Sequence, residues 1–257
     1  MAALCHTRSL VLGLPASIRA GLFDLDGVLT QTAREHAAAW KQMFDEYLSA
    51  RAQRTGEPFK AFDSHADYDA YIDGKLRADG TRAFLESRDI HLPEGNKDDP
   101  PDAETVNGLS NRKNEILLER LRTNGIQVYP GSVQYLRACK DAGLPRAVVS
   151  ASANTRQVLE AAHLTDEFDV IVDGVVADRE HLKGKPAPDS YLAAARRLNV
   201  SPSDAAVFED ALAGVEAGKA GGFGFVVGVD RVGQREDLQK HGADVVVDDL
   251  SELLDRA

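Results

Sequence analysis

The sequence predicts an α/β fold, in which a helical cap domain is inserted into a Rossmann-like core built on a parallel sheet. Three features predict it: apolar runs that alternate with helical stretches after Pro130, a similar run near the N-terminus, and a polar helical pattern between them. Apolar runs separated by helices are typical of parallel strands covered on both faces. We therefore expect a discontinuous core, residues 1–33 and 129–257, and a cap at residues 34–128.

Short apolar runs mark the expected strands. The first, residues 20–23, is followed by acidic residues and a glycine, as a buried strand is at its carboxyl end. The later runs are residues 146–149, 170–172, 205–208, 225–227 and 244–247. Helical stretches lie between most of them, for example residues 190–198 and 212–220. The first run has no partner in the helical segment beside it, so we expect it to join the same sheet.

The expected cap is amphipathic. Apolar residues recur at steps of three and four along one helix face, and they are Ala37, Trp40, Met43, Phe44 and Tyr47. Leu117, Leu118 and Leu121 follow the same spacing later in the segment. Residues 95–102 form a loop by composition. These patterns predict helices that pack on one another, with Trp40 in the cap core.

Composition excludes several classes of protein. The chain has 257 residues, of which 43% are hydrophobic and 28% charged, which is typical of a globular protein. Its net charge of −11 argues against binding to nucleic acid or to a membrane surface. Cys5 and Cys139 are too few for a disulfide framework, and the apolar run at residues 10–16 is too short to span a membrane. We expect a cytoplasmic protein.

Polar residues follow several of the expected strands. Asp24 and Asp26 come after the first run, and Glu209 and Asp210 follow residues 205–208. Two hydroxyl residues, Ser150 and Ser152, follow residues 146–149, and Lys185 follows a loop. Ligands of open parallel sheets bind beyond the carboxyl ends of the strands. The sequence therefore predicts one site that combines carboxylates, hydroxyls and an ammonium group.

These groups suit phosphoryl transfer. Crowded carboxylates without a Cys or His cluster favour Mg²⁺ over zinc. A hydroxyl and a lysine beside that cation can hold a phosphoryl group, and a carboxylate can act as the nucleophile. A second carboxyl two residues along a strand reaches the same site only if the backbone turns, which Gly27 permits. That carboxyl could protonate the leaving oxygen.

Four segments also resemble a known family. Phe23-Asp24-Leu25-Asp26-Gly27-Val28-Leu29-Thr30 resembles the first motif of the haloacid-dehalogenase-like phosphotransferases, and Ser150, Lys185 and Glu209-Asp210 resemble the other three in the same order. Within that family, residues 35–41, 73–77, 112–114 and 150–154 are similar to the β-phosphoglucomutases, and residues 185–189 are shared with many phosphatases.

The resemblance implies roles for these residues. Asp24 would take the phosphoryl group and Asp26 would act as general acid and base. Mg²⁺ would be held by Asp24, Asp210 and the Asp26 carbonyl, with Glu209 nearby. Ser150 and Lys185 would hold the transferring phosphoryl group.

The resemblance also implies a substrate-binding set. Arg77, Ser152 and Asn154 would grip the distal phosphate, and Gly74 would line the cap side. His36 and Lys113 would orient the substrate and couple cap closure to Asp26, and Asn114 belongs to the same set. Gln31, Gly80 and Ala153 depart from the pattern, in places that bear on which sugar phosphate is accepted.

The expected activity is a Mg²⁺-dependent mutase that interconverts β-glucose 1-phosphate and glucose 6-phosphate through an aspartyl phosphate and a bisphosphate. Its partner would be a small phosphorylated sugar, with glucose 1,6-bisphosphate as activator, and the protein would be a monomer or a weak dimer. A phosphatase for a small sugar phosphate, or a mutase for another hexose, would use the same residues. A non-catalytic phospho-acceptor like a receiver domain is a distant alternative, because receivers are shorter and lack the insertion.

Overall fold

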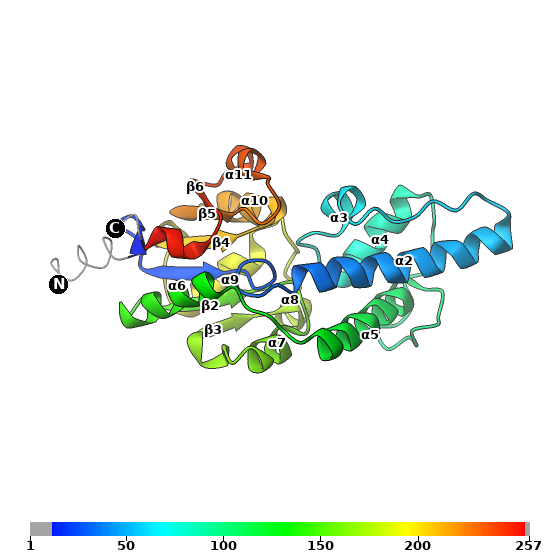
Figure 1. Ribbon diagram of the computed structural model, residues 1–257, viewed down its shortest axis with the longest axis horizontal. Helices are drawn as coiled ribbons and strands as arrows, with labels where there is room; N and C mark the ends of the chain where they lie inside the picture. Colours follow the sequence, from blue (N-terminus) through cyan, green and yellow to red (C-terminus); the bar gives the residue numbers. More distant parts are fainter. Residues whose placement is uncertain (1–11, 255–257) are drawn as a thin grey trace. The chain divides into compact units, whose positions relative to one another are not determined.

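The computed structural model of the chain describes residues 12–254 (Figure 1). Cys5 and the first residues of the apolar run at 10–16 lie outside the described residues. The chain forms two compact units. The first consists of Met1–Gln31 and Gln127–Ala257, and the second of Thr32–Ile126.

The first unit is built on a parallel sheet of six strands in the order β3-β2-β1-β4-β5-β6. The strands are β1 (Ala20–Phe23), β2 (Arg146–Val149), β3 (Val170–Val172), β4 (Ala205–Glu209), β5 (Phe225–Val229) and β6 (Val245–Val247). Each lies within two residues of an apolar run in the sequence. The predicted α/β class is confirmed, and β1 joins the sheet between β2 and β4 as expected.

Helices cover both faces of this sheet (Figure 1). They are α6 (Pro130–Asp141), α7 (Thr155–Ala161), α8 (Gly174–Arg179), α9 (Asp189–Leu198), α10 (Leu212–Ala220) and α11 (Arg235–His241), with 3₁₀ turns η1 (Thr165–Glu167), η2 (Pro202–Asp204) and η3 (Leu250–Leu253). Leu22 of β1 packs in one buried cluster with Tyr191 of α9 and Val215 of α10. The next residue, Phe23, packs against Tyr135 of α6. Because successive strand residues point to opposite faces, α6 lies across the sheet from α9 and α10.

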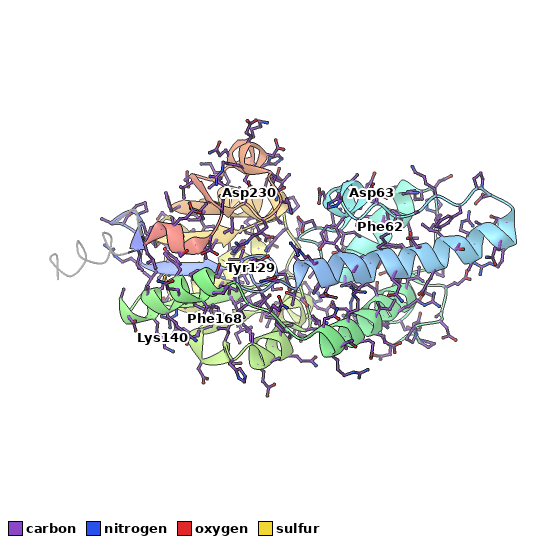
Figure 2. All side chains as sticks on the ribbon, in the orientation of Figure 1. Phe62, Asp63, Tyr129, Lys140, Phe168 and Asp230 are labelled. Carbon is purple, nitrogen blue, oxygen red and sulfur yellow. The ribbon has the colours of Figure 1, made fainter. Side chains whose placement is uncertain are left out.

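Aromatic rings fill the α6 side of the sheet. Phe23 stacks on Phe208 of β4 with ring centroids 4.2 Å apart. Tyr135 meets both rings edge-on or tilted. Phe168, which is labelled in Figure 2, packs edge-on against Phe23 at 6.4 Å. This packing fixes the ends of β1 and β4, which are the two strands whose carboxyl ends carry the acidic residues.

The second unit is helical. It contains α2 (Ala33–Thr55), α3 (Ala66–Tyr71), α4 (Arg77–Ser87) and α5 (Val106–Asn124). The predicted face of α2 is buried from Trp40 to Tyr47, while Ala37 is half-buried. Phe44 packs on Phe62, which is labelled in Figure 2, and on Phe84, with ring centroids 5.2 and 4.2 Å away. Residues 95–102 are irregular, as composition predicted.

None of the helices in residues 12–254 has the length and apolar character needed to cross a membrane.

Candidate active site

A tight turn after β1 places the first two acidic residues. The Asp24 N–H donates to the Phe208 carbonyl at 2.9 Å, which extends the pairing of β1 with β4 by one residue. The turn is closed by hydrogen bonds from Gly27 N–H to the Thr30 carbonyl at 2.7 Å and from Leu29 N–H to the Leu25 carbonyl at 2.9 Å. Gly27 has φ +92°, and a Cβ there would collide with the carboxylate of Asp210. Only glycine therefore lets the turn approach Asp210 so closely.

A carboxylate cluster lies at the carboxyl ends of β1 and β4. Among the described residues, Asp24, Glu209 and Asp210 each offer a carboxylate oxygen, and these three oxygens lie within 4.8 Å of one another. Glu209 is fully buried and Asp24 nearly so. A cluster of hard oxygen donors is the kind of site that Mg²⁺ prefers.

Lys185 lies among these carboxylates. Its Nζ donates to Asp24 Oδ1 at 2.6 Å and to Glu209 Oε1. Glu209 also accepts hydrogen bonds from the Tyr191 hydroxyl at 3.0 Å and from the Ala211 N–H at 3.1 Å. Three carboxylates gathered around one ammonium group concentrate negative charge at this point, and a divalent cation would reduce it. The donor set therefore fits a Mg²⁺ ion.

Burial dominates the electrostatics of the cluster. It raises the pKa of Asp24 well above its ordinary value, and Glu209 and Asp26 add to the rise against the opposing effect of Lys185. Burial alone would lower the pKa of Lys185, but the carboxylates of Asp24 and Glu209 outweigh it and raise that pKa. Lys185 is therefore held as a cation.

Asp26 lies beside the serine that follows β2. The Ser150 hydroxyl donates to Asp26 Oδ2 at 3.4 Å and accepts from the Ser152 N–H at 3.1 Å. The Ser152 hydroxyl in turn accepts from the Asn154 N–H at 3.2 Å. Hydrogen bonds between every second residue thus link Ser150, Ser152 and Asn154 in a turn at the same edge of the sheet as the carboxylates.

The Asp26 carboxylate does not belong to the cluster of Asp24, Glu209 and Asp210. The predicted role of its carbonyl as a metal ligand stays a prediction.

The remaining predicted substrate residues belong to the helical unit. Lys113 is 3% exposed, and its Nζ lies 3.2 Å from His36 Nδ1 and 5.0 Å from the centre of the Trp40 ring. Because an ammonium group has only donors, His36 Nδ1 accepts this hydrogen bond. The structure therefore brings together two residues from the predicted substrate-binding set.

The other three members of that set lie in α4, α5 and the turn before α4. Arg77 Nη1 donates to the Ser110 carbonyl at 3.3 Å, and burial lowers the pKa of its guanidinium. Gly74 has φ +69° in the turn before α4, and Asn114 follows Lys113 on α5. Each of these residues is half-buried.

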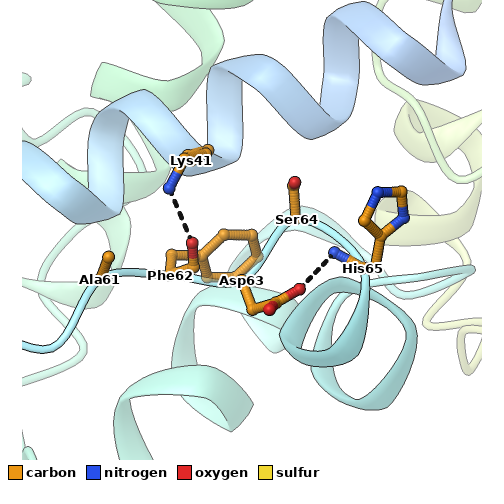
Figure 3. A pocket seen from close by; sticks show the side chains of 6 residues that line it. All are labelled: Lys41, Ala61, Phe62, Asp63, Ser64 and His65. Atoms are coloured by element: carbon orange, nitrogen blue, oxygen red, sulfur yellow. Dashed lines mark hydrogen bonds between the residues drawn. The ribbon is translucent and has the colours of Figure 1, made fainter.

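An open cavity of about 330 Å³ in the helical unit is lined by other residues, which are Lys41, Ala61, Phe62, Asp63, Ser64 and His65 (Figure 3). Lys41 donates to the Phe62 carbonyl at 2.9 Å, and Asp63 accepts from the His65 N–H at 2.8 Å. None of these six lining residues was predicted to bind substrate.

Sequence reasoning missed several residues of the site. Tyr191 binds Glu209, and a Cβ at Gly214 in α10 would collide with the Glu209 carboxylate. The Gln234 side chain donates to the Asp210 carbonyl at 2.9 Å, and Arg231 donates to the Gly27 carbonyl at 2.8 Å. An isolated glycine inside a helical pattern often marks a place where another group packs closely against the helix, so the sequence did indicate a close contact at Gly214. The other three carried none.

Comparisons with known proteins agree with this geometry. The family described as haloacid dehalogenase-like hydrolase matches residues 18–222. A β-phosphoglucomutase of Mycobacterium bovis is 59% identical over 252 residues, which cover 97% of this chain and 96% of the relative. One from Bacillus subtilis is 33% identical over 92% of each chain. The crystal structure of a β-phosphoglucomutase from Clostridium difficile superposes with a TM-score of 0.71 at 29% identity, covering 92% of this chain and 93% of the other.

Proposed function

The chain belongs to the β-phosphoglucomutase group of the haloacid dehalogenase-like hydrolases, and we propose that it interconverts β-glucose 1-phosphate and glucose 6-phosphate. The observation that carries this conclusion is the 59% identity with a β-phosphoglucomutase along 97% of the chain. The prediction of an enzyme of this type is confirmed by the same relationship.

In the proposed reaction, Asp24 is the nucleophile. A carboxylate oxygen of Asp24 forms a bond to phosphorus while the bond from phosphorus to the sugar oxygen breaks, and Asp26 gives that oxygen a proton. In the reverse transfer, Asp26 takes the proton from the attacking sugar hydroxyl. The position of Asp24 beside Lys185 at 2.6 Å and the hydrogen bond of Asp26 with Ser150 support these roles.

Two such transfers account for the isomerisation. The phospho-Asp24 enzyme gives its phosphoryl group to the 6-hydroxyl of β-glucose 1-phosphate, which yields glucose 1,6-bisphosphate and free Asp24. Asp24 then takes the phosphoryl group from the oxygen on carbon 1, which yields glucose 6-phosphate and restores phospho-Asp24. Glucose 1,6-bisphosphate is therefore an activator, since it phosphorylates Asp24 for the first cycle.

Asp24, Glu209 and Asp210 would hold Mg²⁺, together with the main-chain carbonyl of Asp26. When bound, the ion would neutralise charge that develops on the transferring phosphoryl group. Ser150 and Lys185 would bind the same phosphoryl oxygens from the protein side.

We assign phosphoryl transfer to a core of residues 1–33 and 129–257, and substrate recognition to a cap of residues 34–128. His36, Gly74, Arg77, Lys113 and Asn114 of the cap would bind the sugar phosphate together with Ser152 and Asn154. The cationic side chains of Arg77 and Lys113 support this assignment, because a mutase must retain a bisphosphate that water could otherwise attack. The phosphoryl group can pass to the sugar or to water, and the ratio of the two outcomes depends on the difference between their free-energy barriers. A change of about 1.4 kcal/mol in that difference changes the ratio tenfold.

The test is product analysis. Purified protein is mixed with β-glucose 1-phosphate, Mg²⁺ and a trace of glucose 1,6-bisphosphate, and glucose 6-phosphate and inorganic phosphate are followed together. We expect glucose 6-phosphate to accumulate, with no product when EDTA replaces Mg²⁺ or when the α-anomer replaces the β-anomer. Release of inorganic phosphate without glucose 6-phosphate would instead support the phosphatase alternative.

A further inference from the structure

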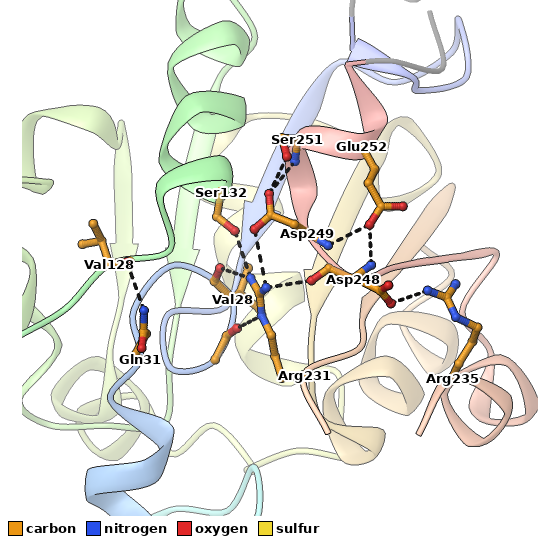
Figure 4. Close-up of polar contacts among 11 residues, drawn as sticks. Val28, Gln31, Val128, Ser132, Arg231, Arg235, Asp248, Asp249, Ser251 and Glu252 are labelled. Atoms are coloured by element: carbon orange, nitrogen blue, oxygen red, sulfur yellow. Dashed lines mark hydrogen bonds and ion pairs between the residues drawn. The ribbon is translucent and has the colours of Figure 1, made fainter. Parts of the chain in front are cut away.

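Arg231, in the loop between β5 and α11, contacts the turn that carries Asp26. Its Nε donates to the Gly27 carbonyl at 2.8 Å, and its Nη2 donates to the Val28 carbonyl at 3.3 Å (Figure 4). The side chain is 13% exposed, so water competes weakly for these bonds. A residue 204 positions away in sequence thus holds two successive peptide groups of the turn.

The rest of the guanidinium is anchored to parts of the α/β unit outside the turn. Nη1 donates to the Asp248 carbonyl at 2.7 Å, and Nη2 donates to the Ser132 hydroxyl at 3.1 Å (Figure 4). The guanidinium carbon also lies 3.6 Å from the centre of the Tyr129 ring. Five N–H donors in a rigid planar fork can make such contacts at once, which a lysine cannot. The turn is therefore fastened to the segment after β6 and to the start of α6.

The loop that carries Arg231 is itself well ordered by its own contacts. Asp230 Oδ1 accepts hydrogen bonds from three successive N–H groups, those of Val232, Gly233 and Gln234, at 3.2, 2.7 and 2.9 Å. From the same loop, Gln234 Nε2 donates to the Asp210 carbonyl at 2.9 Å. One loop thus contacts both acidic segments of the candidate site.

We propose that Arg231 is a positioning residue for phosphoryl transfer, which it serves by holding the Asp26–Gly27 turn in place. Gly27, at φ +92°, has little conformational preference of its own, so the contacts that its peptide groups make, within the turn and with Arg231, define its orientation. Arg231 contacts no reacting atom and acts through the Gly27 and Val28 carbonyls. The inference rests on the proposed function, because the role of Asp26 as acid and base comes from there.

The test compares Arg231→Gln and Arg231→Lys with Arg235→Gln. Arg235 is a matched control, since it donates to the Asp248 carboxylate (Figure 4) and, at 2.6 Å, to the Val246 carbonyl, away from the turn. We expect both Arg231 variants to lower kcat by about tenfold or more, because small misplacements of reacting groups are costly. KM for β-glucose 1-phosphate should stay within about threefold, since an interaction that aligns the transition state is lost and binding is not. Arg235→Gln should change neither constant.

Hydrogen–deuterium exchange gives a readout that needs no activity. The amides of Gly27, Leu29 and Thr30 are hydrogen-bonded within the turn, and they should exchange faster in the Arg231 variants than in the wild type or Arg235→Gln. If Arg231→Gln does not fold, Arg231→Lys supplies the same comparison. Unchanged kcat and exchange in a folded Arg231 variant would overturn the inference, as would equal losses in the Arg235 control. Failure of the wild type to form glucose 6-phosphate would overturn the proposed function instead, and the exchange result would stand apart from it.

Discussion

Replacement of Gly214 by alanine tests the packing of the site against its supporting helix. Gly214 lies in the first turn of α10, where an alanine normally stabilises a helix by about 1 kcal/mol relative to glycine. Here the added methyl group would collide with the carboxyl carbon and both oxygens of Glu209. Because the conflict is with a buried charged group, we expect the ordinary preference to be reversed.

The magnitude follows from the contacts that Glu209 must give up. Its carboxylate is fully buried and accepts hydrogen bonds from Lys185, from Tyr191 at 3.0 Å and from the Ala211 N–H at 3.1 Å. Loss of two hydrogen bonds to a charged group would cost about 3–6 kcal/mol. After the gain in helix propensity, the free energy of unfolding should fall by about 2–5 kcal/mol. Lys185 would shift with Glu209, so kcat should fall as well.

Urea denaturation and steady-state kinetics measure both effects. Gly218→Ala, one turn later on α10, is the matched control, since its methyl group would lie 3.1 Å from Val226 Cγ2 and 3.4 Å from Val207 and would meet no carboxylate. Overpacking against the valines costs about 1–3 kcal/mol and the gain in helix propensity offsets about 1 kcal/mol of it, so we expect Gly218→Ala to lower the stability by less than about 2 kcal/mol and to keep its activity. If Gly214→Ala were as stable and as active as the wild type, the placement of Glu209 against α10 would be wrong.

Two further predictions concern buried polar groups. Burial raises the pKa of the Cys139 thiol to about 12, so at pH 8 Cys139 should resist thiol reagents in the folded protein and react only after unfolding in urea; peptide mass spectrometry that found Cys139 modified in native protein would contradict this. Lys113→Met fills a similar volume beside Trp40 but removes the hydrogen bond that His36 Nδ1 accepts, so Tm should fall slightly, and kcat/KM should fall about ten- to a hundredfold through loss of a charged hydrogen bond to substrate. An unchanged kcat/KM would remove Lys113 from the substrate-binding set.

Side-chain pattern predicted the strands well because buried parallel strands are apolar along their whole length. It was less accurate where pairing continues past the apolar run. β5 extends to Val229 because Gly228 pairs with Glu209 on one side and Val246 on the other, and that pairing needs no side chain. β6 begins one residue later than predicted, at Val245. Asp244 instead accepts a hydrogen bond from the Val226 N–H with its side chain.

The acidic residues of the site were predictable because they lie at, or directly after, the carboxyl ends of strands that share one edge of the sheet. Tyr191 and Arg231 were not, since each reaches the site from an element whose position is set only by the folded sheet. In the sequence, Tyr191 has the spacing of an ordinary core residue of α9. Its ring does pack in the core, and its hydroxyl also donates a hydrogen bond to Glu209. The local spacing of apolar residues predicts whether a side chain is buried, but it does not predict which group its polar atoms contact.

The central claim, that Asp24 carries the phosphoryl group, is tested most directly by trapping the phosphoenzyme. Wild type and Asp24→Asn are incubated with glucose 1,6-bisphosphate and Mg²⁺, quenched in acid and mapped by peptide mass spectrometry, with circular dichroism to show that the variant is folded. We expect one phosphoryl group on Asp24 of the wild type, removable by hydroxylamine, and neither phosphorylation nor turnover in folded Asp24→Asn. A phosphoryl group on another residue, or wild-type turnover by Asp24→Asn, would contradict the account.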